Sequence, residues 1–539
     1  MVVKNQVNTD SHFYLLVLVT AAMLAVSGCM MVGPNYVRPP APTAGMWIET
    51  GDPAVKRDTA DVGVWWKVFN DPVLNTLVET AYRQNPSLRA AGVRVLEAQA
   101  RRGIAIGQLF PQTQEAFGDA TTNELSKNRA NRSAPFIKRE YDDWQVGFDA
   151  TWELDVWGRF RRNIEAVDAE LLASVASYDD VLVSLVAEVA RNYTLLRTIE
   201  ARLAVARENV AIQTRSFDIA DAKFKGGTVT ELDSAQAASL LHDTEAQIPG
   251  LESDIRQTQN TLCILLGIPP QDLQQILGGT KPIPIPPTEV AVGIPADLLR
   301  RRPDIRRAER QLAAQSAQIG IAKADLFPHF ALLGTISIAS RDFEDLFKSS
   351  SLENFGGPSF RWAILNYGRI ENNVRVQDAS FQALISDYET TVLRAQGEVE
   401  NAIAAYLGAQ RQVNFLTGSV SSAARAVELA QFQYREGASD YTRVLNTQQF
   451  LVTEQDRLVS TQGSVALNLV AVYKALGGGW ELRIGKDLVP QETKRQMVER
   501  TAWGGVLTTD EQAQDLNAAA SGTESDRSWW RWRWWWPKW

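Results

Sequence analysis

The sequence contains few of the residues that bind metals or form disulfide bonds. Its 539 residues include three histidines, His12, His242 and His329, which are too few and too widely spaced for a histidine-rich metal site. If Cys29 is modified, the other cysteine, Cys263, has no intrachain partner and no disulfide framework is possible. We therefore expect no bound metal ion and no fold that depends on disulfide bonds.

Strong charge and enzymatic motifs are also scarce. The formal net charge of −8 is mild and argues against a nucleic-acid-binding protein, which would carry a concentrated basic face. No nucleophile, metal or phosphate motif is found, and Ser27-Gly28-Cys29 does not match a nucleophile elbow. Hydrophobic residues make up 45% and charged residues 22% of the chain, as in an ordered protein. The composition thus favours an ordered protein that is not an enzyme.

The N-terminus carries the pattern of a secretory signal. An apolar stretch at residues 13–26 follows Lys4 and is too short to span a bilayer well. Small residues precede Cys29 in the run LAVSGC (24–29), which resembles a bacterial lipobox. The resemblance implies cleavage after residue 28, a diacylglycerol on the thiol of Cys29 and an acyl chain such as palmitate on its amine. Each buried methylene contributes roughly 0.8 kcal/mol to membrane affinity, so several chains hold a protein firmly.

The alternative is an ordinary signal peptide followed by a chance cysteine. In the lipoprotein interpretation, covalent lipid on Cys29 is the one cofactor that we expect, and Cys263 has no intrachain partner. Met30 follows Cys29, and the absence of aspartate at this place fits the sorting of bacterial lipoproteins to the outer membrane.

The rest of the chain lacks a long apolar run. A spanning helix needs about 20 apolar residues. The richest later stretch, residues 181–190, follows Asp179 and Asp180 and contains Glu188. If the mature chain enters a membrane, it must do so as a closed β-barrel, because open strands would leave backbone groups unpaired in lipid.

The chain is internally duplicated, with the same features in the same order in both halves. The first set of matches pairs Pro86, Ile104, Ala105, Leu109, Phe110 and Pro111 with Pro303, Ile321, Ala322, Leu326, Phe327 and Pro328. The second set pairs Trp152, Gly158, Arg159, Asn163, Asp168, Glu188, Gly227, Leu266 and Gly267 with Trp362, Gly368, Arg369, Asn373, Asp378, Glu398, Gly437, Leu476 and Gly477. A proline-rich linker, residues 268–296, joins the repeats, and its proline density excludes helix and favours extended chain.

Each repeat is predicted to contain a long helical hairpin. In residues 159–225 the apolar positions follow heptad spacing: Leu171, Val175, Tyr178, Leu182, Leu185 and Val189. At 1.5 Å per residue, such a helix is on the order of 100 Å long, too long for a globular core. On periodicity alone, an intrachain coiled coil with no channel is an equal alternative.

Glycines mark the turns of the hairpins. The first hairpin turns at Gly226 and Gly227 and returns over residues 231–266, where Pro249 should kink or break the helix. The second hairpin runs over 369–435, turns at Gly437 and returns over about 440–476.

Alternation of apolar and polar residues predicts four strands, two in each repeat, at about 112–121, 144–154, 329–339 and 359–366. Trp152 and Trp362 lie at strand ends, as aromatic residues do at a bilayer surface, although core packing explains either one equally well. Single-chain membrane barrels start at eight strands, so four cannot close one. The count therefore predicts a homo-oligomer; three chains would give about twelve strands.

Four runs resemble the signatures of the TolC-like outer-membrane efflux proteins, and within them the NodT-type RND efflux lipoproteins. They are LDVWGR (154–159), IPADLLRRRPDIR (294–306), IGIAKADLFP (319–328) and YKALGGGW (473–480), and the likeness covers roughly residues 29–488. The resemblance implies a homotrimer with a twelve-stranded transmembrane β-barrel and a periplasmic α-barrel of helical hairpins. It also implies a periplasmic adaptor protein and an inner-membrane pump, often proton-driven, as partners.

The family closes its periplasmic mouth at the hairpin turns. The matching tip is residues 434–446, so the resemblance implies a gate formed by Asp440, Thr442, Arg443 and Asn446. Many members carry an aspartate where Asn446 stands and a large apolar residue where Thr442 stands. An acidic ring would favour cations; Asn446 departs from that pattern, although Asp440 could supply another ring. Solvated helix-tip residues with no gating role are an equal alternative.

The predicted fold is mainly α with a transmembrane β part. The expected segments are a signal peptide (1–28), an extended segment after the lipidated cysteine (29–70), a first repeat (71–267), the linker (268–296), a second repeat (297–480) and a C-terminal segment (481–539). Residues 529–539 contain seven tryptophans with Arg531, Arg533 and Lys538. This composition suits a membrane interface, although a disordered tail with no function explains it equally well.

The predicted function is that of the outer-membrane channel of a tripartite efflux system. Such a channel passively conducts substrates from an inner-membrane pump and a periplasmic adaptor, and it would be lipid-anchored in the outer membrane and extend into the periplasm. Two alternatives remain: a duct for protein secretion on the same scaffold, and a lipid-anchored periplasmic coiled-coil scaffold. Strand alternation at matching places in both repeats argues against the scaffold.

Overall fold

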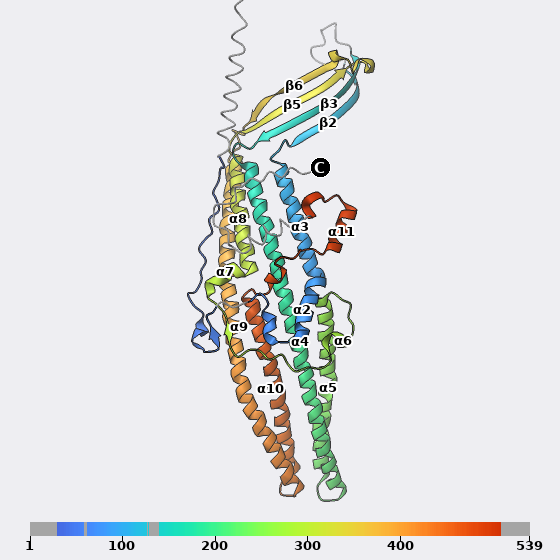
Figure 1. The fold of residues 1–539 in the computed structure, drawn as a ribbon, viewed down its shortest axis with the longest axis vertical. Coiled ribbons are helices and arrows are strands. Elements are labelled where there is room, and N and C mark those ends of the chain that lie inside the picture. The colour runs from blue at the N-terminus through green and yellow to red at the C-terminus, as the bar shows by residue number, and fades with distance from the viewer. Residues whose placement is uncertain (1–29, 59–61, 127, 129–138, 508–539) are drawn as a thin grey trace, which may run out of the picture. The chain divides into compact units, whose positions relative to one another are not determined.

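The computed structural model describes residues 30–58, 62–126, 128 and 139–507 (Figure 1). The predicted signal peptide, Cys29 and the tryptophan-rich tail lie outside these residues. Contacts divide the chain into two compact units. The sheet unit comprises Met1–Pro39, Glu97–Ala173 and Glu309–Asp387, and the hairpin unit comprises Pro40–Leu96, Ser174–Ala308 and Tyr388–Trp539.

The sheet unit contains one four-stranded antiparallel sheet. Its strands are β2 (Thr113–Glu124), β3 (Glu140–Leu154), β5 (His329–Ser340) and β6 (Leu352–Arg361), in the order β2-β3-β5-β6 (Figure 1). The prediction of four strands, two from each repeat, is confirmed, and the central pair β3 and β5 joins one repeat to the other.

The fourth strand begins earlier than predicted. Alternation suggested 359–366, but β6 includes Gly356, Gly357 and Pro358, which in sequence resemble a turn. An edge strand tolerates proline, because the N–H groups on its outer side have no partner within the sheet. Pairing of β6 along most of β5 therefore overrides the local sequence signal.

The two faces of the sheet differ in polarity. One face carries Val146 and Phe148 of β3 beside Ile336 and Ile338 of β5, and Ile336 is 62% exposed in the single chain. On the other face, Glu115, Asp149 and Thr335 form one cross-strand row, in which the Thr335 hydroxyl donates to Asp149 Oδ1 at 2.5 Å. An exposed apolar face of this kind marks a surface that contacts lipid or protein.

Each strand pair is joined to a helix end by the same tryptophan bond. Trp152 Nε1 donates to Leu109 O at 3.2 Å, and Trp362 Nε1 donates to Leu326 O at 3.0 Å. Leu109 follows α3 (Pro86–Gly107), and Leu326 follows α8 (Pro303–Ala324). The duplication seen in sequence is therefore repeated in the geometry of the strand–helix corner.

Four long helices form the two predicted hairpins. They are α4 (Arg159–Lys225), α5 (Glu231–Leu266), α9 (Arg369–Arg435) and α10 (Tyr441–Ala475) (Figure 1). The predicted long helices are confirmed, and the heptad residues of α4 are buried within the single chain: Leu171, Val175, Tyr178, Leu182, Leu185 and Val189. Among the residues that the structure describes, no helix is both long enough and apolar enough to cross a membrane.

Pro249 does not break α5, which continues from Glu231 to Leu266 through this residue. Proline lacks the N–H that would bond the carbonyl of Glu245, one turn earlier. Both Pro249 and Glu245 are exposed, so water can solvate that carbonyl. The loss is tolerated at this surface position, so of the expected kink or break, the break does not occur.

The linker also departs from the prediction that its prolines exclude helix. A single helical turn, α6 (Gln274–Leu277), forms in the proline-free part of the linker. The buried Arg197 side chain holds the end of this turn by donating to Leu277 O and to Gly279 O, both at 2.8 Å. Further along, β4 (Val290–Ala291) pairs in parallel with β1 (Val55–Lys56) and so ties the linker to the N-terminal segment.

A buried ion cluster in the hairpin unit explains part of the signature runs. Asp179 of α4 is 0% exposed and binds two arginines. Arg306, at the start of α8, donates to its Oδ2 at 2.7 Å, and Arg483 contacts both carboxylate oxygens. The ring of Trp480 lies 4.5 Å from the Arg306 guanidinium and 5.7 Å from that of Arg483. The cluster thus ties the end of the second repeat to the first long helix.

We predict that Asp179→Asn destabilises the hairpin unit by about 3–5 kcal/mol, because it leaves the buried Arg483 and the largely buried Arg306 without their shared charge partner. The control is Glu428→Gln on α9, whose ion pair with Arg425 is largely exposed and is expected to contribute less than about 1 kcal/mol. Denaturant unfolding of the two variants measures the difference. Equal midpoints for both variants would contradict a stabilising role for the cluster.

Candidate functional site

Both hairpins end in the same kind of turn, a Schellman motif. Two backbone bonds close each turn: Thr228 N to Lys223 O and Gly227 N to Phe224 O in the first, and Ala438 N to Gln433 O and Gly437 N to Tyr434 O in the second. Gly227 has φ 69° and Gly437 has φ 73°, values that glycine adopts without steric cost. Gly226, Gly227 and Gly437 therefore lie in the two turns, which is where the sequence analysis expected them.

The tips of the two hairpins contact each other through side chains. Lys223 Nζ, near the end of α4, donates to Tyr434 O at 2.6 Å and to Arg435 O at 3.1 Å in the last turn of α9. A cation near helix C-terminal carbonyls is favourable because these groups carry partial negative charge. The Tyr434 hydroxyl donates to Asp233 Oδ2 of α5 at 3.2 Å. One tyrosine of the second hairpin is thus held by both helices of the first.

Apolar packing surrounds these polar contacts. The rings of Tyr434 and Tyr441 meet edge to face with centroids 5.2 Å apart, and Tyr434 is only 4% exposed. Burial, assisted by the nearby Asp233 carboxylate, raises the pKa of Tyr441 to about 12 and also raises the pKa of Tyr434. Both hydroxyls therefore stay protonated at neutral pH, and Tyr434 remains a hydrogen-bond donor.

The predicted gate residues lie at the same tip but on its outer surface. Asp440 caps α10, and its Oδ1 accepts from Arg443 N at 3.4 Å. Thr442, Arg443 and Asn446 are exposed on the first turns of α10, whereas Tyr441, which precedes them, is buried. The sequence analysis did not identify Lys223, Asp233 or Tyr434, because their roles depend on a contact between hairpins that no local pattern encodes.

In the sheet unit, the segment after Cys29 is docked on the start of α4. Val32 N donates to Trp157 O at 3.1 Å. Arg162, which is 2% exposed, donates to Val32 O and Gly33 O, both at 3.2 Å, and to Asn35 Oδ1 at 2.9 Å. The backbones approach so closely that a Cβ on Gly33 would lie 2.4 Å from the Cα of Gly320. We call residues 30–39 the strap.

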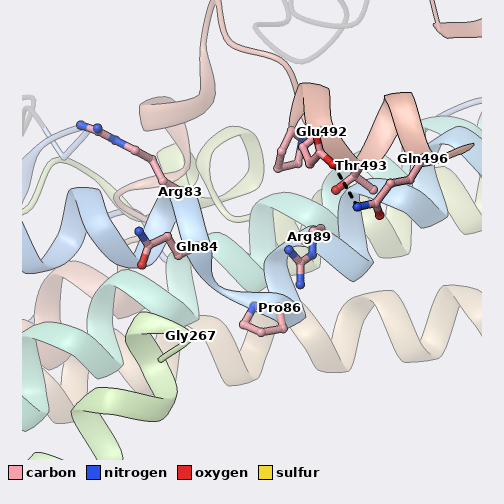
Figure 2. Close-up of a pocket in the computed structure, with 9 residues that line it drawn as sticks. Arg83, Gln84, Pro86, Arg89, Gly267, Glu492, Thr493 and Gln496 are labelled. Carbon is pink, nitrogen blue, oxygen red and sulfur yellow. Dashed lines mark hydrogen bonds between the residues drawn. The ribbon is translucent and has the colours of Figure 1, made fainter. Parts of the chain in front are cut away.

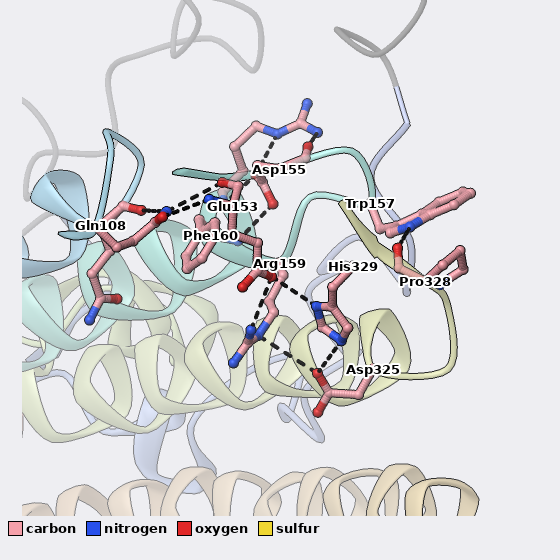
Figure 3. A network of polar contacts seen from close by, with 11 residues as sticks. Gln108, Glu153, Asp155, Trp157, Arg159, Phe160, Asp325, Pro328 and His329 are labelled. Atoms are coloured by element: carbon pink, nitrogen blue, oxygen red, sulfur yellow. Dashed lines mark hydrogen bonds and ion pairs between the residues drawn. The ribbon is translucent and has the colours of Figure 1, made fainter. Parts of the chain in front are cut away.

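A polar network lies where the strands meet the helices of the sheet unit (Figure 3). Glu153 Oε1 lies 2.8 Å from His329 Nδ1 and 3.3 Å from Arg159 Nη1. Asp325 Oδ1 lies 3.7 Å from Arg159 Nε and 3.9 Å from His329 Nε2. The four groups join residues of both repeats around a partly exposed corner, so the network aligns β3 with β5 at their ends.

The hairpin unit also has a pocket of about 640 Å³, shown in Figure 2. Its lining combines Arg83 and Arg89 with Glu492 and Gln496 of α11 (Gln491–Arg500). Its two arginines are exposed at the surface. Across the described ranges of the chain, no group of histidine, cysteine and acidic residues has the arrangement of a metal site.

Comparison with known proteins agrees with this architecture. A family model described as Outer membrane efflux protein matches residues 77–268 and 294–478, one match in each repeat. The pyoverdine export outer membrane protein OpmQ of Pseudomonas putida is 33% identical over 77% of this chain and 88% of its own length. Nodulation protein T of Rhizobium leguminosarum bv. trifolii is 31% identical over 85% of this chain and 96% of its own length.

A solved structure, the outer-membrane channel OprN, superposes with a TM-score of 0.77 at 32% identity, over 84% of this chain and 99% of that channel. Similarity over nearly the full length of this channel confirms the predicted TolC-like fold with its long helices and four-stranded sheet. Two repeats that each match the same family model show that the chain belongs to the Outer membrane efflux protein family, the outer-membrane channels of efflux pumps, which are not enzymes.

Proposed function

We propose that three copies of this chain form one passive efflux duct, with about twelve strands closed into a barrel in the outer membrane. The observation that carries the proposal is the open sheet: β2 and β6 are its edge strands. In lipid, each unpaired backbone group costs several kcal/mol, so an open edge must find a partner. Pairing β6 of one copy with β2 of the next supplies that partner at every junction.

The polarity of the two sheet faces supports the same arrangement. The face with Val146, Phe148 and Ile336 suits lipid, and the face with Glu115 and Asp149 suits a water-filled lumen. The hairpin helices then continue the duct through the periplasm. The duct has no energy source of its own, so transport is driven by an inner-membrane pump, of the RND type, through a periplasmic adaptor.

We predict that the detergent-solubilised protein has three times the mass of the 59.8 kDa chain, apart from bound detergent and removal of the signal peptide. In planar lipid bilayers it should give an ohmic conductance without nucleotide or a proton gradient, because the duct is passive. Light scattering and single-channel recording measure these two properties. A monomer with no conductance would refute the closed barrel.

The gate of this duct is assigned to the hairpin tips. The contacts of Lys223 and Asp233 with Tyr434 hold the two hairpins together, which supports a closed resting state. Asp440, Thr442, Arg443 and Asn446 lie on the exposed side of the same tip and would line the aperture. Opening then requires the second hairpin to leave the first.

We predict that Tyr434→Phe and Lys223→Met each raise the open probability of the reconstituted channel. Each change removes a hydrogen bond that involves a charged group, worth about 1.5–3 kcal/mol, which shifts the closed–open equilibrium about tenfold or more. Tyr441→Phe is the matched control, because its ring packs beside Tyr434 while its hydroxyl takes no part in the contacts between the hairpins described above. If gating is unchanged in Tyr434→Phe, or changes equally in Tyr441→Phe, the contacts of Lys223 and Asp233 with Tyr434 do not hold the tip closed.

We also propose that Cys29 carries a diacylglycerol and an N-acyl chain after removal of residues 1–28. The docked strap supports this assignment, since it holds Met30, the next residue, near the end of β3 by a 3.4 Å bond from Arg161 Nη2 to Met30 O. The lipid would then enter the bilayer at the level where the strands begin.

The lipid anchor predicts that Cys29→Ser abolishes incorporation of an alkyne-labelled palmitate into the protein in cells. Cys263→Ser should incorporate the label normally, because Cys263 is buried at the end of α5 and is the other cysteine of the chain. Gel fluorescence after coupling a dye to the label measures both variants. Labelling that survives Cys29→Ser would remove the proposed anchor and leave the channel proposal untouched.

A further inference from the structure

Polar side chains interrupt the buried face of α4 shortly before the first hairpin turn. The buried residues of α4 between 203 and 220 recur at steps of three and four, which is the spacing of a coiled-coil seam. They are Leu203, Ala206, Asn209, Gln213, Ser216 and Ala220. Three consecutive seam positions are therefore polar, whereas the heptad positions earlier in α4, from Leu171 to Val189, are aliphatic or aromatic.

These polar positions face the second hairpin. Asn209 Nδ2 donates to Gln455 Oε1 of α10 at 2.9 Å. The Ser216 hydroxyl accepts from Gln448 Nε2 of α10 at 2.8 Å and from Gln431 Nε2 of α9 at 3.2 Å. We call the following residues the polar layer: Asn209, Gln213, Ser216, Gln431, Gln448 and Gln455.

The polar layer is only partly hydrogen-bonded. Gln213 lies between Asn209 and Ser216 on the same face of α4, about one turn from each. It is 2% exposed, yet neither its amide nitrogen nor its amide oxygen has a partner among the residues that the structure describes. Gln448 is also 2% exposed, and its amide oxygen has no such partner either. Buried amide groups of this kind disfavour the packed state, because water hydrogen-bonds them once the surfaces separate.

The second repeat is apolar where the first has Gln213. At the offset of 210 residues, Gln213 corresponds to Ala423 of α9, which is 4% exposed and packs with Val427 and Leu451. The same place in the hairpin is thus filled by a small apolar residue in one repeat and by an amide without a partner in the other. General packing of a long hairpin therefore does not account for the amide.

We propose that the polar layer is a regulatory element of the hairpin gate, which weakens the closed contact between the two hairpins so that they can separate. This inference rests on the proposed function, because it takes separation of the hairpins as the opening step. The contacts of Lys223 and Asp233 with Tyr434 favour the closed arrangement, and the polar layer opposes it. An unpartnered buried amide and a charged hydrogen bond each shift an equilibrium about tenfold or more, so the two effects are of comparable size.

A buried polar layer can instead fix the register of packed helices. The bonds of Asn209 to Gln455 and of Ser216 to Gln448 suit that role, since each pairs one residue of α4 with one of α10. Gln213 does not, because an amide without a partner favours no particular register. The weakening effect therefore depends most on Gln213, and this residue distinguishes the two roles.

The test measures separation of the hairpins in the full chain, purified in detergent. Ala220 is 0% exposed and lies in one buried cluster with Ala430 and Tyr434 of the second hairpin. A cysteine at this place reacts with a maleimide only when the hairpins separate. The reporter is therefore Ala220→Cys, and mass spectrometry of the peptide that contains residue 220 gives the rate of modification.

Three substitutions are compared in this reporter chain. Gln213→Met replaces the amide by an unbranched apolar side chain of similar length. Ser216→Ala removes the hydroxyl that accepts from Gln448, so that Gln448 also becomes unpartnered. The matched control is Gln449→Met, which makes the first change at an exposed position of α10.

We expect Gln213→Met to lower the rate of modification about tenfold, because it removes amide groups that only the separated hairpins expose to water. Ser216→Ala should raise the rate by a similar factor, and Gln449→Met should leave it unchanged. A rate in Gln213→Met that equals that of the control overturns the proposal. A higher rate also overturns it, since that is the result expected of a residue that fixes register.

Single-channel recording of the same variants separates this inference from the proposed function. Slower modification together with a lower open probability in Gln213→Met supports both the polar layer and the gate at the tips. Slower modification with an unchanged open probability supports the effect of the layer on the hairpins and contradicts the position of the gate. Absence of conductance in every variant contradicts the duct, whereas the rates of modification still decide whether the layer weakens the contact.

Discussion

Two strands of the sheet, β2 and β6, are its edges, and each has one row of backbone N–H and C=O groups that pairs with no other strand among the described residues. Water can satisfy such an edge at a protein surface, but a bilayer cannot. Placing the apolar face of this sheet in lipid therefore forces the edges to pair with other copies. In the proposed duct, the oligomer, the lumen on the charged face and the grouping of the hairpins all depend on this one requirement of the backbone.

Duplication explains how a single chain meets that requirement with repeated parts. Each repeat contributes two strands, one tryptophan bond at the strand–helix corner and one hairpin. Left-handed glycines recur at equivalent places, with φ of 78° and 79° where α4 and α9 begin, at Gly158 and Gly368. Copies of one repeat pair with each other as β3 and β5 inside the chain, and the proposed trimer extends edge-to-edge pairing to neighbouring chains.

The sequence was most informative where the structure is periodic. Heptad spacing and glycine turns predicted the bounds of α4, α5 and α9, because these helices are set by local pattern and burial of one face. The fourth strand was misplaced because Gly356, Gly357 and Pro358 oppose strand formation locally, while pairing with β5 imposes it. Residues that act through distant partners, such as Arg162 of α4, which binds the strap, and Asp179 in the ion cluster, left no local signal.

The tips of the two hairpins differ in sequence at the residues that join them. Lys223, Phe224 and Asp233 of the first hairpin correspond to Gln433, Tyr434 and Arg443 of the second. The contacts between the two tips use the lysine and the aspartate of the first hairpin and the tyrosine of the second. The same contacts therefore cannot form between two identical hairpins. If hairpins of the first and second repeats alternated around a ring, each such contact would join the hairpin of a second repeat to one particular hairpin of a first repeat. In the proposed duct, the gate would therefore rest on side chains that differ between the two repeats, whereas the turns themselves are the same in both hairpins.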